Sequence, residues 1–92
     1  MKLVSVERSV CLYDNISHDI TREFLLTISS DHNISVARLR EIVVPQEEDP
    51  LLFEPYVLNL SQVLQLNEYL ENDIDPDFKT HYYVLECTGI YD

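Results

Sequence analysis

The sequence predicts an α+β domain, a small antiparallel sheet with two helices packed on one face, in the order β-β-α-α-β. Alternating apolar segments open and close the chain, and period-two alternation is typical of half-buried strands. Between them lie two segments with apolar residues at helical spacing. With 92 residues, of which 46% are hydrophobic, the chain can form one core. We therefore expect residues 1–92 to form a single domain.

Strands are expected over residues 2–14, 21–28 and 79–91. The first two are separated by residues 14–19, which are rich in turn formers, so they should form an antiparallel hairpin. β-branched and aromatic residues dominate the last segment, as is common in strands. The alternating residues that predict these strands are Val4, Val6, Val10 and Leu12, then Phe24, Leu26 and Ile28, then His81, Tyr83, Leu85 and Cys87.

Helices are expected over residues 35–44 and 60–71. Ser35 can cap the first helix, and Pro45 stops it. Asn59 can cap the second, with Gln62 three residues later as in a capping box. The apolar face of the second helix is expected to contain Leu60, Val63, Leu64 or Leu66, and Leu70.

An acidic loop with two prolines, residues 46–55, is expected between the helices. Leu51, Leu52 and Phe53 form an apolar patch within it.

Charge is the feature of this chain that says most about function. The formal net charge is -11, and no positive side chain lies between Arg40 and Lys79. Like charges repel one another in a compact fold, so such a window either serves solubility or faces a cationic partner. The acidic balance argues against nucleic acid and anionic membranes as partners. The ten acids of the window are Glu41, Glu47, Glu48, Asp49, Glu54, Glu68, Glu71, Asp73, Asp75 and Asp77.

Aromatic residues lie among these acids, and aromatic anchors within a charged surround are typical of protein-binding patches. A solvated face would explain any single acid equally well. For the window as a whole we favour a protein-binding surface, because natural surfaces usually mix the two signs of charge. The candidate partner-binding residues are Glu47, Glu48, Asp49, Phe53, Glu54, Tyr56, Glu68, Tyr69, Glu71, Asp73, Asp75 and Asp77.

No metal or cofactor site is predicted. The spacing of Asp73, Asp75 and Asp77 resembles the start of a calcium loop, but that loop needs a Gly and a bidentate acid at later positions. Phe78 and Val84 occupy those positions. The histidines and cysteines have no metal-ligand spacing, and a chain with one Gly cannot build a Gly-rich phosphate loop.

Catalysis is not predicted either. Cys11 and Cys87 are expected to be buried thiols without a disulfide. A reactive cysteine needs an electropositive surround that stabilises its thiolate, and this chain is electronegative almost throughout. We therefore expect a protein that is not an enzyme.

Three short parts of the chain resemble a family of small bacterial domains of unknown function. They are residues 6–14, the segments 48–52 and 55–58, and residues 82–87. The resemblance spans most of the chain and implies no catalytic residues. As a small, acidic, single-domain chain it also resembles the immunity proteins of bacterial toxin systems, including colicins and contact-dependent growth inhibition. That resemblance implies a non-catalytic inhibitor that binds and neutralises a cationic toxin domain, with a nuclease as the leading candidate.

Two alternatives stay open at this point. One is a housekeeping interaction or regulatory module without a toxin partner, and a more distant one is a small-molecule-binding or enzymatic domain. The sequence does not predict the oligomeric state. No run of residues reaches the length of a membrane span, and the first residues meet a charge before a signal-peptide core could form. We therefore expect the protein in the cytoplasm.

Overall fold

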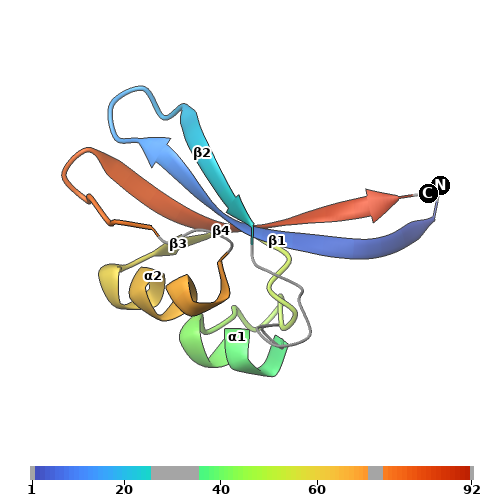
Figure 1. Cartoon of the computed structure of the whole chain (residues 1–92). Coiled ribbons are helices and arrows are strands. Elements are labelled where there is room, and N and C mark those ends of the chain that lie inside the picture. Colours follow the sequence, from blue (N-terminus) through green and yellow to red (C-terminus); the bar gives the residue numbers. More distant parts are fainter. Residues whose placement is uncertain (1, 26–35, 71–73, 92) are drawn as a thin grey trace.

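The computed structural model describes residues 2–25, 36–70 and 74–91, and it confirms the predicted α+β class. In this part of the chain four strands form one antiparallel sheet, and both helices lie on the same face of it (Figure 1). A short strand that the sequence analysis did not predict separates the helices. The elements are β1 (Leu3–Asp14), β2 (Ile20–Leu25), α1 (Val36–Ile42), β3 (Tyr56–Leu58), α2 (Leu60–Leu66), the 3-10 turn η1 (Asn67–Tyr69) and β4 (His81–Tyr91).

The sheet is built around its two long central strands. Its order is β2-β1-β4-β3, and β1 pairs with β4 from Leu3 opposite Tyr91 to Asp14 opposite His81. The outer strands are much shorter, so the far ends of β1 and β4 extend beyond them. These ends, residues 3–8 and 87–91, form a two-stranded arm that projects from the body and carries both chain termini at its tip (Figure 1).

The predicted hairpin between the first two strands is confirmed. β1 and β2 pair antiparallel, and the turn between them is held by the Asp14 carboxylate, which accepts hydrogen bonds from the amides of Ile16 and Ser17 at 2.8 and 2.9 Å. His18, in this turn, has a φ of 61°. The last three residues of the predicted second strand, 26–28, lie outside the described residues.

The capping box of the second helix is also confirmed. The Asn59 side chain accepts a hydrogen bond from the amide of Gln62, and the Gln62 side chain accepts one from the amide of Asn59. The α-helix ends at Leu66 rather than at residue 71, because the Asn67 side chain binds both the amide and the carbonyl of Ile74 and turns the chain back. The predicted cap at Ser35 lies outside the described residues.

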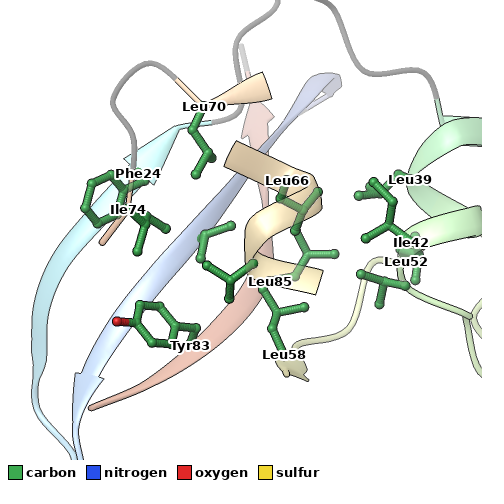
Figure 2. Packing of buried hydrophobic residues seen from close by; sticks show 13 residues of the cluster. Phe24, Leu39, Ile42, Leu52, Leu58, Leu66, Leu70, Ile74, Tyr83 and Leu85 are labelled. Carbon is green, nitrogen blue, oxygen red and sulfur yellow. The ribbon is translucent and has the colours of Figure 1, made fainter. Parts of the chain in front are cut away.

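The core fills the space between the sheet and the helices, and Figure 2 shows side chains from both layers meeting there. Two parts of the sequence interpretation need correction. Leu60 was expected on the apolar face of α2 but is 52% exposed, and of the alternatives Leu64 and Leu66 only Leu66 is buried. The buried cluster consists of Val10, Phe24, Leu39, Ile42, Val43, Leu52, Leu58, Val63, Leu66, Leu70, Ile74, Tyr83 and Leu85.

Leu52 is the second correction, since it belongs to this core and not to a patch on the acidic loop. Its side chain is fully buried, and its φ of 57° places it in the left-handed region. That conformation costs a non-Gly residue about 1–2 kcal/mol. Burial of a whole leucine side chain is worth about as much or more, so packing can hold the loop in this shape. Among the described residues, no helix has the length and apolar character of a membrane span.

Candidate functional site

The acidic loop, residues 46–55, is organised around one buried carboxylate. Asp49 is only 7% exposed. It accepts hydrogen bonds from the amides of Phe53 and Glu54 at 2.9 and 3.0 Å and from the hydroxyl of Tyr56 at 2.7 Å. The same hydroxyl accepts a hydrogen bond from the amide of Gln46 at 3.1 Å. Both ends of the loop are therefore tied to a single aspartate–tyrosine pair.

The pKa of Asp49 shows that its carboxylate is held in the charged form. Burial acts to raise this pKa, but the hydrogen bonds from Tyr56, Glu54 and Phe53, together with nearby Arg8, outweigh burial and lower it below its ordinary value. Burial and the bond to Asp49 raise the pKa of Tyr56. Asp49 and Tyr56, both predicted as contact residues, thus have a structural role inside the loop.

The outside of the loop presents three carboxylates, those of Glu47, Glu48 and Glu54. All three side chains are exposed, and none forms an ion pair or hydrogen bond with another described residue. Phe53 directly precedes Glu54 in the sequence of the loop, and it is 48% exposed. The structure therefore brings four of the predicted contact residues together on the surface of one loop.

Arg8 of β1 ties this loop to the arm. Its guanidinium Nη2 donates a hydrogen bond to the Leu51 carbonyl at 2.8 Å, and its carbon Cζ lies 5.9 Å from the centre of the Phe53 ring. Next to this contact is a hollow of about 240 Å³ between the loop and the arm. Its lining consists of Val6, Phe53, Cys87, Gly89 and Tyr91.

The remaining predicted contact residues that the structure describes lie in another part of the molecule. Figure 2 places Ile74 at the Phe24 end of the core and Leu52 at the other end. Glu68 and Asp75 are exposed, whereas Tyr69 is partly buried against the core. Glu71 and Asp73 lie outside the described residues.

Asp77, near Asp75 in the sequence, also has a structural task. Its carboxylate accepts hydrogen bonds from the hydroxyl of Thr80 and the amide of Lys79, at 2.9 and 3.0 Å. These bonds lower the pKa of Asp77. The acidic residues of the window thus fall into separate groups. The best organised of these groups is the one in the acidic loop, residues 46–55.

The sequence analysis missed a third acidic surface, the sheet face away from the helices. Cross-strand neighbours point to the same face, and the register places Glu7, Glu23 and Glu86 on this one. Tyr13 and Tyr82 stack there with ring centroids 5.3 Å apart. The alternation of the strands was the available signal, because it separates these five residues from those that face the core.

Two of these five residues, Tyr13 and Glu86, interact directly. The hydroxyl of Tyr13 donates a hydrogen bond to the Glu86 carboxylate, and this bond is the main reason that the pKa of Tyr13 rises to about 12. Glu86 is therefore partly engaged within the protein, unlike the three glutamates of the acidic loop.

The two cysteines are free thiols, with Cys11 buried and Cys87 half-buried. Burial is the main cause that raises the pKa of Cys11 to about 12, and burial also raises that of Cys87. Both thiols therefore stay protonated at neutral pH, where a nucleophilic cysteine would need to be a thiolate. Among the described residues, no group of three or more His, Cys, Asp or Glu side chains is arranged to hold a metal ion.

The fold defines a small α+β domain, with a four-stranded antiparallel sheet covered on one face by two helices. The chain belongs to the family described as "Domain of unknown function (DUF7683)", which matches residues 7–86. This membership agrees with the resemblance to small domains of unknown function that the sequence motifs indicated. No curated protein and no solved structure matches the chain.

Proposed function

We propose that this protein is a non-catalytic binding protein for a cationic protein domain, and that it acts as an immunity protein that neutralises a toxin in the cytoplasm. One observation carries the proposal: Glu47, Glu48 and Glu54 are exposed on the same loop as the half-exposed Phe53, and Asp49 holds the shape of this loop from inside. The glutamates have no cation partner among the described residues. A partner can therefore supply one.

The organisation of the loop suits fast and stable association. Exposed charges of one sign attract an oppositely charged surface and speed the encounter. Because the backbone amides at Phe53 and Glu54 are already bonded to Asp49, the loop loses little conformational freedom when it binds. An exposed aromatic ring on such a loop can supply the desolvated contact that keeps the complex together.

A nuclease domain fits this surface on chemical grounds. Nucleases present Lys, Arg and His side chains to phosphate groups, so a surface with several carboxylates can cover such a site or a basic patch beside it. The free thiols have raised pKa values, which agrees with a protein that blocks a reaction and does not catalyse one.

The test first asks whether a toxin gene lies directly upstream in the source genome, and it then uses the toxin domain that this gene encodes. We expect the wild-type protein to form a stable complex with this domain and to suppress its activity. The loop-reversal variant, in which Glu47, Glu48 and Glu54 are all replaced by Lys, should bind weakly and fail to suppress it.

A control variant with the same change in net charge separates the loop from a general effect of charge. It replaces Asp19, Glu23 and Glu41 by Lys, three exposed acids outside the candidate set. This control reversal variant breaks one exposed ion pair, between Arg38 and Glu41, and the long hydrogen bond of 4.0 Å from the Cys11 thiol to Glu23. Exposed ion pairs contribute little to stability. It should still neutralise the toxin. Equal loss in both variants would contradict a contact through the loop, and the absence of a complex with wild type would contradict a toxin as the partner.

A further inference from the structure

Gly89 is the one glycine of the chain, and it lies inside β4 rather than in a turn. It does not have a positive φ, so its backbone conformation is open to any residue. A glycine inside a strand weakens the strand and often marks a place where another backbone or a ligand comes close. Gly89 lines the hollow between the arm and the acidic loop, which is where its missing side chain leaves room.

The edge of β4 beside this hollow is open. β3 pairs only with residues Tyr83 to Leu85 of β4, so from Glu86 to Tyr91 that edge has no strand partner among the described residues. Pro55 directly precedes β3 and has no amide hydrogen to donate, which prevents β3 from continuing along the edge. Unpaired strand edges can accept an additional strand from another chain.

The hollow lies beside the open edge of β4, so a single added strand would contact both. Cys87, Gly89 and Tyr91 alternate along β4 and line the hollow, so they share the face of the sheet that points to the helices. A strand added beside β4 would direct every second side chain to that same face. One of these side chains would lie over Gly89 and beside Phe53.

The charges around the edge indicate what such a strand should carry. Glu86 begins the open edge, where its carboxylate also accepts a hydrogen bond from Tyr13, and the exposed Glu54 follows Phe53 directly. Residues 86–91 contain no lysine or arginine, and Arg8, which lies opposite Cys87, is engaged with the Leu51 carbonyl and the Phe53 ring. Opposite charges across neighbouring strands stabilise their pairing. An added strand that alternates basic and apolar residues would place its basic side chains on the face that carries Glu86 and its apolar ones in the hollow.

We propose that the open edge of β4 takes up an extended basic segment of the protein partner as a fifth strand, with one apolar side chain seated in the hollow over Gly89. This inference rests on the proposed function and names the form in which the cationic partner is recognised. Gly89 is then a specificity-determining residue, because any larger side chain there occupies the space that the partner's side chain needs.

The probe is the peptide acetyl-Lys-Leu-Lys-Leu-Lys-Leu-Lys-amide, and its Kd for the protein is measured by calorimetry. Two versions of it carry N-methyl groups, one at the Lys positions and one at the Leu positions. In a strand, alternate amides point to opposite edges, so one methylated version should bind at least about tenfold more weakly and the other should bind nearly as the parent does. Equal affinity of all three peptides, or no binding of the parent, would overturn strand addition.

Two protein variants test the hollow. Gly89→Val should weaken binding of the parent peptide at least about tenfold, and Gly89→Ala should weaken it less. Thr88→Val is the matched control, since Thr88 is the adjacent, exposed residue of β4 and lies on the other face of the strand; it should change Kd by less than about twofold. Unchanged affinity in both Gly89 variants would overturn the proposal. If the Gly89 variants bind the toxin domain normally while the loop-reversal variant does not, the proposed function stands and this inference falls.

Discussion

The hydroxyl of Tyr56 donates a 2.7 Å hydrogen bond to the carboxylate of Asp49. Both residues looked from the sequence like members of a contact surface. Their pairing instead holds the acidic loop closed, and it leaves the neighbouring glutamates and Phe53 on the outside. A function in partner binding therefore depends on these two residues through the shape of the loop.

Removal of this hydrogen bond should destabilise the protein. Tyr56→Phe keeps the ring, but it leaves a buried carboxylate without one of its donors and the amide of Gln46 without its acceptor. We expect the Tm to fall by roughly 5 °C, which is typical of a modest loss of stability in a domain of this size. Tyr91→Phe is the control, because Tyr91 is exposed and makes no hydrogen bond through its side chain with another described residue. Equal Tm values for both variants would show that the pair does not hold the loop.

Asp49 should also make the stability depend on pH. Its pKa is lowered in the folded protein, so its charged form stabilises the fold above the pKa of the unfolded state, and this contribution is lost as the pH falls through the folded value. Urea unfolding below about pH 4 should therefore show a steeper loss of stability in wild type than in Asp49→Asn. Part of the loss should persist in the variant, because the pKa values of Asp14 and Asp77 are lowered as well. Parallel curves for the two proteins would argue against a charged, bonded Asp49.

Phe53 and its neighbour Leu52 should behave in opposite ways. Phe53 is half-exposed, so Phe53→Ala should change the free energy of unfolding by less than about 1 kcal/mol and speed dissociation of the toxin domain by about tenfold. Leu52 is fully buried, and Leu52→Ala should cost about 2–5 kcal/mol in the free protein. Urea unfolding measures the changes in stability, and binding kinetics with the toxin domain immobilised on a sensor surface measure the dissociation rate. A large loss of stability in Phe53→Ala would mean that Phe53 is a core residue.

Gly89 should be replaceable without harm to the fold. Because its backbone is extended and its φ is not positive, Gly89→Ala should raise the free energy of unfolding by about 0.5–1 kcal/mol, which is the usual cost of a glycine inside a strand. Thr88→Ala, at the adjacent exposed position, should give no such gain. A destabilised Gly89→Ala variant would indicate that the glycine is needed for close packing within the chain itself.

Local patterns in the sequence predicted much of the fold. Period-two alternation located the long central strands, and the Asn59–Gln62 pair located the start of α2, because such signals depend only on nearby residues. β3 was missed for the opposite reason: three residues after Pro55 carry too short an alternation to be distinguished from a loop. Only their pairing with Tyr83 to Leu85 of β4 makes a strand of them.

The sequence predicted that the candidate site is charged, but it did not predict which of its residues lie on the surface. Nothing in the sequence near Asp49 distinguishes it from Glu47 and Glu48, since its burial depends on amides and a hydroxyl that converge only in the folded loop. The hollow above Gly89 joins two parts of the chain that are distant in sequence. Sequence periodicity does not report such long-range contacts.

The association rate constant with the toxin domain, measured over a range of salt concentrations, tests the central claim most directly. Exposed charges that attract a partner are screened by salt. Wild type and the control reversal variant should therefore associate quickly at low salt and much more slowly at high salt. The loop-reversal variant should associate slowly at all concentrations, with a weak dependence on salt. The same rates and the same salt dependence in the loop-reversal variant as in wild type would contradict the claim that the acidic loop meets a cationic partner.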